Sequence, residues 1–392
     1  MQVTTKYYLF VALFNLGFAG TFVAYGPFLR SIGLSLGEIG ILNTIFWVVL
    51  IASEIPTGLL ADGRSRAWSL KAGAFTFALG ALAYFFASGF WSAALAEALV
   101  GIGGAFLSGA QQAWITDALE RAGKSNERRK VFATESAVRS AVIIVGGMAG
   151  PLLAVHSYKY IWLPLIVTGI LTSLFVHFKM NGAGEPLTRV DERAAFALAL
   201  AHLKRSRELK WLIAVVFLFG TVVVFNHYWS IYFKEQVGLF GVSFIWPILY
   251  GSVFVSGLVI RKIKVPQGQE GKLIILSTVL AGLGLLGVGF VQGTIFPIGI
   301  IMIHEFGRGM SEPLMGSYVQ HRVESSYRAT FGSLQSLLGR SGCALAPLIV
   351  WLTIGGKPNN QETISTVWMW AGAVLIVGAI FLYVIRPKPS QT

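Results

Sequence analysis

Long apolar runs recur along this chain at short intervals, and they restrict its fold more than any other feature. A helix of about 20 apolar residues crosses a hydrocarbon layer of about 30 Å. Because lipid offers backbone amides no hydrogen-bond partners, each run is predicted to be a helix. We therefore expect an all-α integral membrane protein with twelve transmembrane helices. The runs are roughly 7–29, 38–61, 69–88, 92–116, 131–154, 160–178, 210–233, 241–260, 273–292, 295–316, 330–353 and 365–385.

The composition supports a membrane protein over a soluble one. Hydrophobic residues make up 55% of the chain and charged residues 12%, whereas soluble domains carry about 25% charged residues. The net charge of +13 comes from short connectors between apolar runs, so it indicates membrane orientation and not nucleic-acid binding. Cys343 is the only cysteine, which excludes an intrachain disulfide and a cysteine metal site. The first run is too long for a signal peptide and is predicted to be an uncleaved helix.

The basic residues predict the orientation of the chain. If the N-terminus is cytoplasmic, 24 of the 31 Lys and Arg residues fall in cytoplasmic segments. This asymmetry holds through every connector and predicts that both termini are cytoplasmic, in a multi-pass protein of the cell membrane. The four exceptions on the other side are Arg30, Lys159, Lys234 and Lys357, and the three inside apolar runs are Arg139, Arg308 and Arg340.

One long polar connector divides the runs into two sets of six. We expect an N-terminal six-helix bundle at 1–180, a linker at 181–209 and a C-terminal six-helix bundle at 210–392. The linker is predicted to contain an amphipathic helix at about 190–206, acting as a tether or as a lipid-contacting segment. Short repeats relate the halves, since Thr57–Asp62 ends the second run and Ser256–Arg261 ends the eighth. Repeated halves are typical of carriers that bind substrate near the membrane midplane.

A motif after the second apolar run points to a family. It reads Gly58-Leu59-Leu60-Ala61-Asp62-Gly63-Arg64-Ser65-Arg66. It resembles the signature G-x-L-A-D-[RK]-x-G-[RK]-[RK] of the major facilitator superfamily, with departures at Gly63, Ser65 and Ala67. The resemblance implies a major facilitator fold of two pseudo-symmetric bundles, with Asp62 and Arg66 gating the outward-facing state. Gly58 is expected to allow two helices to approach closely.

A second resemblance lies in the fifth run. The stretch Gly146-Gly147-Met148-Ala149-Gly150-Pro151-Leu152-Leu153-Ala154 is similar to the antiporter signature G-x-x-x-G-P-x-x-G. Together with Glu54-Ile55-Pro56-Thr57, it resembles bacterial drug/proton exporters. This resemblance implies that Gly146, Gly150 and Pro151 take part in gating. A Gly-Pro kink that only packs helices remains the alternative.

One residue departs from the drug-exporter pattern. Those exporters carry an arginine in the fourth run, ahead of a glycine-rich stretch. This chain has Glu97 there, before Gly101, Gly103 and Gly104. If that arginine assists proton transfer in relatives, this chain must move protons by other groups.

Ionisable residues inside apolar runs are the candidates for proton coupling. Each costs at least about 2.5 kcal/mol at mid-membrane, so it needs a partner, a water-filled cavity or a function. Glu305, Arg308 and Glu312 follow His304 at spacings that place them on one helical face. They are expected to form a proton switch, with a static ion cluster as the alternative. A second candidate route comprises Glu54 and the i, i+4 pair Glu135–Arg139.

Polar and aromatic residues within the runs are candidates for substrate contacts, because such side chains rarely face lipid. They are Gln111, Gln112, Trp114, Asn226, His227 and Arg340. The sequence lacks G-x-x-x-x-G-K-[ST], G-x-S-x-G and H-E-x-x-H, so no ATP hydrolysis, cofactor or metal is expected.

The predicted function is proton-coupled secondary transport, with export of small amphipathic or drug-like molecules by alternating access. The alternatives are proton-coupled uptake of a metabolite and transport of a lipid or siderophore. A more remote one is an integral-membrane lipid enzyme. The expected partners are a small-molecule substrate, protons and membrane lipids, with no nucleic acid, and the protein is expected to be a monomer.

Overall fold

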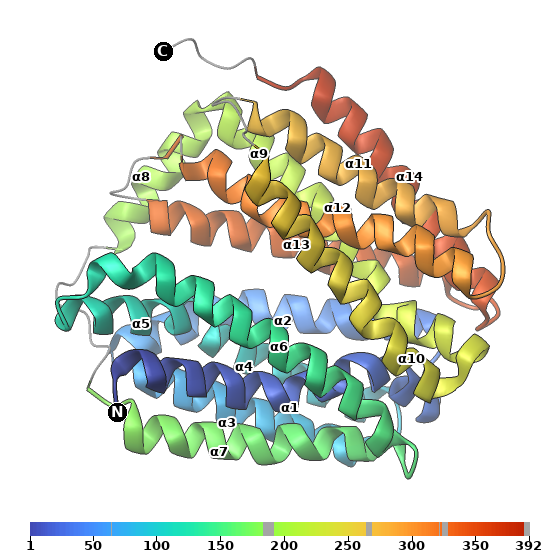
Figure 1. The fold of residues 1–392 in the computed structure, drawn as a ribbon, viewed down its shortest axis with the longest axis horizontal. Helices are drawn as coiled ribbons and strands as arrows, with labels where there is room; N and C mark the ends of the chain where they lie inside the picture. The colour runs from blue at the N-terminus through green and yellow to red at the C-terminus, as the bar shows by residue number, and fades with distance from the viewer. Residues whose placement is uncertain (64, 183–191, 264–268, 321, 324–327, 388–392) are drawn as a thin grey trace. The chain divides into compact units, whose positions relative to one another are not determined.

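The structure is a computed structural model that describes residues 1–63, 65–182, 192–263, 269–320, 322–323 and 328–387. Within these ranges every regular element is a helix. The chain forms two compact units (Figure 1). Unit 1 comprises Met1–Arg189 and Leu239–Trp246, and unit 2 comprises Val190–Gly238 and Pro247–Thr392.

Unit 1 is a bundle in which α1 packs against α6 and α7, α3 against α4 and α7, and α2 against α4 (Figure 1). Its core includes Tyr7, Phe10 and Trp114, which are fully buried. Its helices are α1 (Val3–Ser31), α2 (Leu36–Gly63), α3 (Arg66–Phe85), α4 (Phe90–Leu107), α5 (Ala110–Arg121), α6 (Arg128–Ala154) and α7 (Leu163–Lys179), with short 3-10 turns η1 (Ser125–Glu127) and η2 (Tyr158–Trp162).

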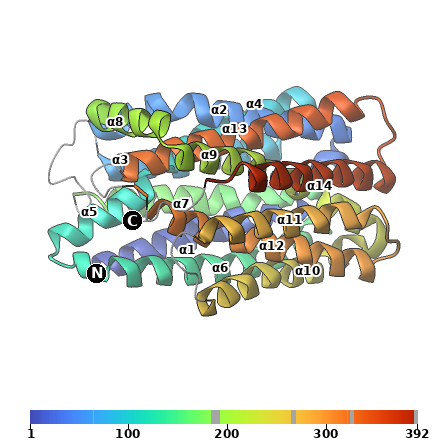
Figure 2. The same ribbon diagram turned by 90° about the horizontal axis from the view of Figure 1, so that it is seen from above.

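Unit 2 is a second bundle, in which α11 packs against α12 and α14, and α13 against α9 (Figure 2). A helix, α8, lies in the segment where the linker helix is expected, and it packs against α13 and α9 of this unit. The elements are α8 (Glu192–Arg205), α9 (Arg207–Phe219), η3 (Gly220–Val222), α10 (Val223–Lys262), α11 (Glu270–Val288), α12 (Ile295–Gln320), α13 (Arg328–Ile354) and α14 (Gln361–Val384).

The helices agree with the twelve expected membrane spans. In the described part of the chain, nine helical segments are long and apolar enough to cross a membrane. One of them, Arg207–Lys262, contains two spans, because α10 bends at Gly238, where the backbone is non-helical with φ of +70°. The helices α3 and α12 supply the remaining two of the twelve. The helix α12 is the one that carries Glu305, Arg308 and Glu312.

Small residues bring helices of unit 1 into close contact. A Cβ atom on Gly150 would overlap the Gly20 carbonyl oxygen, and one on Gly146 would lie 2.8 Å from the Ala19 Cβ. The antiporter-like glycines therefore hold α6 tightly against α1. Gly58 is different, since a Cβ there would meet no atom within 4 Å. Within the described residues of unit 1, no helix lies close to Gly58, and the close approach expected there stays a prediction.

Candidate functional site

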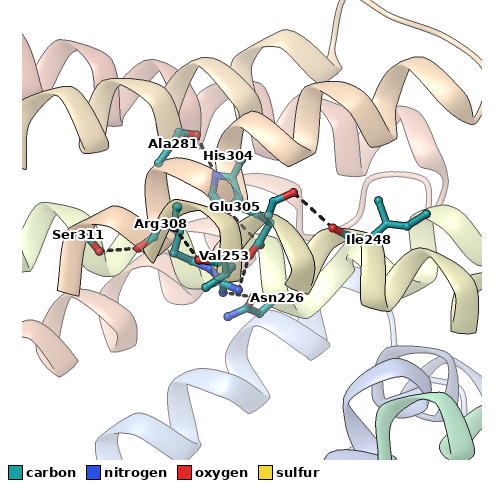
Figure 3. Close-up of polar contacts among 10 residues, drawn as sticks. Asn226, Ile248, Val253, Ala281, His304, Glu305, Arg308 and Ser311 are labelled. Atoms are coloured by element: carbon teal, nitrogen blue, oxygen red, sulfur yellow. Dashed lines mark hydrogen bonds and ion pairs between the residues drawn. The ribbon is translucent and has the colours of Figure 1, made fainter. Parts of the chain in front are cut away.

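The most concentrated set of buried polar groups in unit 2 lies on α12, where it packs beside α10 and α11. Figure 3 shows Arg308 turned towards both Glu305 and Asn226. Arg308 Nη2 donates to Glu305 Oε2 at 2.5 Å, and its Nη1 donates to Asn226 Oδ1 at 2.9 Å. These residues and His304 form what we call the α12 cluster. Its Glu305–Arg308 pair has the i, i+3 spacing that the sequence predicts to share one face.

In the α12 cluster, the buried carboxylate of Glu305 pairs with the partly exposed guanidinium of Arg308. The Glu305 side chain is 2% exposed and the Arg308 side chain 26%, while Asn226 is exposed. Ion pairs in apolar surroundings are stable only while both charges remain, because removing one leaves the other uncompensated. Protonation of Glu305 would therefore weaken its hold on Arg308 and leave a guanidinium donor free beside Asn226.

His304 approaches the carboxylate oxygen of Glu305 that Arg308 does not bind. Its Nδ1 is 2.8 Å from the Ala281 carbonyl oxygen on α11, and because a carbonyl only accepts, Nδ1 carries a proton. In the neutral ring, Nε2 then bears a lone pair, 4.0 Å from Glu305 Oε1. Neither of these two buried atoms has a hydrogen-bond partner in the described structure. At 4.0 Å the two atoms are too far apart for a hydrogen bond in this conformation.

Close packing fixes the backbone that carries the α12 cluster. A Cβ on Gly307 would lie 2.6 Å from the Ser277 carbonyl oxygen of α11, and one on Gly309 2.8 Å from the Val253 carbonyl oxygen of α10. Ser311 Oγ also donates to the Arg308 carbonyl oxygen at 2.7 Å (Figure 3). The helix is therefore held on two sides, so changes at this site involve side chains more than backbone.

Three other predicted residues of unit 2 lie apart from these contacts. Glu312 is exposed, and within the described residues the Arg308 side chain bonds to Glu305 and Asn226 instead. His227 is buried next to Asn226, with its ring near Tyr228, so it contributes to packing. Arg340 lies on α13 and is partly buried.

In unit 1, Glu135 contacts a residue other than the predicted one. It is 6% exposed and accepts a hydrogen bond from Gln111 Nε2 at 3.3 Å. Gln111 also donates to the Tyr7 hydroxyl at 3.4 Å. The expected Glu135–Arg139 ion pair is absent from the described residues, and Arg139 is exposed. Glu135 instead faces α5 and α1, where an amide satisfies its carboxylate.

Two predicted substrate contacts on α5 differ sharply in exposure. Trp114 is fully buried, stacks with Tyr7 and donates from its indole nitrogen to the Met180 carbonyl oxygen at 3.2 Å. In this conformation its ring and its N–H group are used within the core, so the structure gives no support to its predicted substrate role. Gln112, by contrast, is exposed.

Glu54 lies beside an interruption in the fourth span, where α4 ends at Leu107 and α5 begins at Ala110. Ser108 Oγ donates to Glu54 Oε1 at 3.1 Å. Gly109 has φ of +74°, in the left-handed region that glycine adopts without steric cost. Glu54 thus accepts a bond from the side chain of a residue in a non-helical stretch, and membrane proteins tolerate such backbone only inside the protein or around a cavity.

Ion pairs join helix ends in each unit. In unit 1, Arg66 pairs with Asp117 at 3.8 Å. In unit 2, Arg322 donates to Glu208 at 2.9 Å and lies 3.7 Å from Glu270. Arg66 was predicted as a gating residue, and its partner in this conformation is on α5. The predicted gating side chain of Asp62 lies outside the described residues, and Pro151 lies within α6.

One buried acid stands outside all the predicted sites. Glu97 is 5% exposed and accepts hydrogen bonds from the hydroxyls of Tyr25 and Tyr84. In the sequence, the only signal at this position is that Glu97 replaces the arginine of the drug-exporter pattern. The convergence of three helices on the carboxyl group has no local signal in the sequence.

Comparisons with known proteins place the chain in a family. A model of the Major Facilitator Superfamily matches residues 8–347. No curated protein sequence matches the chain. The crystal structure of the nucleoside transporter NupG is similar, with a TM-score of 0.80 at 14% identity over 98% of this chain and 99% of that one.

Two further solved structures share the fold. A D-xylose-proton symporter has a TM-score of 0.73 at 14% identity, covering 100% of this chain and 98% of that one. A POT family peptide transporter has a TM-score of 0.76 at 11% identity, with 100% and 98% coverage. The family match extends over most of the twelve helices, and the three similar structures named above are of transporters. This chain therefore belongs to the Major Facilitator Superfamily and is a membrane transporter, not an enzyme.

Proposed function

We propose that this transporter is proton-coupled and that Glu305 is its main coupling residue. The observation that carries the proposal is the geometry of Arg308, which bonds to the buried Glu305 and to the exposed Asn226 at once. One guanidinium thus connects a site that can take up a proton to a site that can meet solute. No other ion pair in the described membrane interior has this arrangement.

The coupling step follows from charge balance. When Glu305 takes up a proton, it loses its negative charge, and the bond to Arg308 loses its charge assistance. Arg308 is then free to donate to a solute held near Asn226. When the proton leaves, Glu305 recaptures Arg308 and the solute loses that donor. Solute affinity and proton occupancy are therefore linked, which is the thermodynamic requirement for coupled transport.

For direction, we propose two candidates. Proton-coupled uptake is the one that this coupling step favours, because the solute gains its Arg308 donor when the proton is bound. Export in exchange for protons is the other; it is supported by the resemblance of Gly146, Gly150 and Pro151 to the antiporter signature, and it requires that proton and solute bind in turn. A further observation favours uptake. The partly exposed cation of Arg308 beside Asn226 suits polar or anionic solutes and repels cationic drugs. The structural similarity to a D-xylose-proton symporter agrees with uptake.

The test uses purified protein in liposomes under an imposed pH gradient, with internal pH recorded. The probes are ethidium, uridine, D-xylose and a dipeptide. We expect at least one probe to move against its gradient. The proton flux should have the opposite direction for exchange and the same direction for uptake.

The Glu305→Gln variant is expected to lose this movement. Glu362→Gln, an exposed carboxylate at the start of α14, is the matched control and should transport normally. Gradient-independent transport by the wild type contradicts the proposal.

A further inference from the structure

The three oxygen-bearing groups of Glu97, Tyr25 and Tyr84 meet inside unit 1, each from a different helix. Tyr25 of α1 lies 3.0 Å from Glu97 Oε1, and Tyr84 of α3 bonds to Glu97 Oε2. The two hydroxyls lie 3.3 Å apart. The groups therefore form a closed ring of three oxygen–oxygen contacts, which we call the Glu97 ring. The proposed coupling at Glu305 makes no use of it.

The Glu97 ring is enclosed by aromatic side chains. Tyr84 is fully buried and stacks on Trp162 with ring centroids 4.1 Å apart. Phe28 packs edge-on against both, with centroids 5.9 Å from Tyr84 and 5.4 Å from Trp162. Such surroundings replace the water that would solvate a charge with apolar rings, so a bare carboxylate here is strongly disfavoured.

No cation compensates Glu97 in the described part of unit 1, where its hydrogen-bond partners are the two tyrosines. The basic residues at this end of the unit are engaged elsewhere. Arg30 donates to the Leu34 carbonyl oxygen, and the Lys159 ammonium lies over the ring of Phe85. On α2, Asn43 is uncharged and donates to the Ile39 carbonyl oxygen. The acid on that helix nearest its start, Glu38, accepts from Ser35.

The number of protons distinguishes the two forms of the Glu97 ring. A carboxylate only accepts hydrogen bonds, and each tyrosine hydroxyl has one proton to donate. An ionised Glu97 therefore leaves two protons for three contacts, and the Tyr25–Tyr84 contact at 3.3 Å has none. A protonated Glu97 supplies the third. The carboxylic acid then donates to one tyrosine, that tyrosine to the other, and the second tyrosine back to the acid, so every contact carries one proton.

We propose that the Glu97 ring is a second proton-binding site of this transporter, occupied in the conformation described here. A proton bound between α1, α3 and α4 holds these helices together, and its release leaves a charge that favours their separation and the entry of water. Its proton occupancy is independent of the proposed coupling at Glu305, whereas its use in transport rests on that proposed function.

A cavity provides a short route for proton exchange. It has a volume of about 350 Å³ at the end of unit 1 where α1 and α3 terminate, and its walls include Phe28, Ser31 and Ser157. Phe28 belongs both to this cavity and to the aromatic layer over Tyr84. We therefore expect Phe28 to be the side chain that controls access of water from the cavity to the Glu97 ring.

Infrared difference spectroscopy of the purified full-length protein tests the occupancy. A protonated carboxyl group in an apolar site has a carbonyl stretching band that a carboxylate lacks. We expect this band in the wild type, its loss in Glu97→Gln, and its retention in Glu305→Gln and in the control Glu362→Gln. Tyr84→Phe, which keeps the ring and removes the hydroxyl, should retain the band but move it to higher frequency, because the carbonyl loses a hydrogen-bond donor. A band unchanged in both Glu97→Gln and Tyr84→Phe, or no band at all, overturns the proposal.

Transport tests the use of the site. In liposomes with ethidium, uridine, D-xylose and a dipeptide as probes, Glu97→Gln should reduce pH-driven movement at least tenfold and leave exchange of labelled for unlabelled probe unchanged. If Glu97→Gln transports at the wild-type rate in both assays but lacks the infrared band, the coupling role of the Glu97 ring is overturned. The ring then remains a proton-binding site without a role in transport. If the wild type moves none of the probes, the proposed function fails on its own, and the infrared result still decides the site.

Discussion

At the scale of single residues, the α12 cluster depends on the shape of one side chain. The Arg308 guanidinium serves Glu305 and Asn226 through different nitrogens. A lysine ammonium is a compact point charge on a flexible stem and does not reproduce this planar fork. Arg308→Lys should therefore keep the charge balance of the site but lose the link between proton and solute.

We expect Arg308→Lys to slow pH-driven transport by at least about tenfold, equivalent to about 1.4 kcal/mol of barrier. The measurement is the initial rate in liposomes. Arg207→Lys, at an exposed position in the first turn of α9, is the matched control and should transport at the wild-type rate. A wild-type rate in Arg308→Lys would show that charge alone is sufficient at this position.

The contacts of Glu135 predict how two neighbouring substitutions differ in stability. Gln111→Ala removes the amide that donates to this buried carboxylate, and an unsatisfied buried acceptor costs about 1–3 kcal/mol. Arg139→Ala removes an exposed side chain, and such changes stay within about 0.5 kcal/mol. Thermal unfolding in detergent should therefore show a lower midpoint for Gln111→Ala only. If both variants lower the unfolding midpoint equally, the result would instead support an ion pair between Glu135 and Arg139.

Sequence reasoning located some of these residues but few of their contacts. The spacing of Glu305 and Arg308 follows from helical periodicity and was predictable. The partnership of Arg308 with Asn226 was not, because it depends on how α10 packs beside α12. In the sequence, Glu97 stands out only because it replaces the arginine of the drug-exporter pattern. Its contacts with Tyr25 and Tyr84 depend on how α1, α3 and α4 pack, which the sequence does not report.

At the scale of helices, small residues determine which surfaces meet. Gly150 lies against the Gly20 carbonyl, whereas a Cβ at Gly58 would meet no atom of the described part of unit 1 within 4 Å. Alanine at Gly150 must push α6 away from α1. Alanine at Gly58 instead improves helix propensity by about 1 kcal/mol without a clash.

We therefore expect Gly150→Ala to lower the thermal unfolding midpoint and the yield of monodisperse protein, by overpacking worth about 1–3 kcal/mol. Gly58→Ala should leave the midpoint unchanged or raise it. The two variants make the same chemical change in the same unit, so each is a control for the other. A stable Gly150→Ala protein would mean that the close α1–α6 contact is not formed.

Helix boundaries were predicted well where hydropathy changes sharply and less well where a helix breaks within an apolar run. The single run expected at 92–116 is two helices, because Gly109 adopts a positive φ between them. The bend of α10 at Gly238, in contrast, falls in the connector expected between the runs at 210–233 and 241–260. Hydropathy does not report backbone dihedrals, and a glycine in an apolar run is compatible with helix and break alike.

At the scale of the whole molecule, the lipid environment made the fold predictable. Apolar runs must be helices in a membrane, so their number and the family motif were enough to identify a major facilitator transporter. The motif residues around Asp62 carried that identification. Solute and direction were not predictable, because they depend on which side chains share an accessible face, and residues as far apart in sequence as Asn226 and Arg308 form that face.

The coupling role of Glu305 is tested most directly by comparing two modes of transport in one preparation. Any probe that the wild type moves is measured both as exchange of labelled for unlabelled probe at equal pH and as net movement driven by a pH gradient. The account predicts that Glu305→Gln retains exchange and loses gradient-driven movement, because solute still binds while the proton no longer does. Gradient-driven movement at the wild-type rate in Glu305→Gln would contradict it.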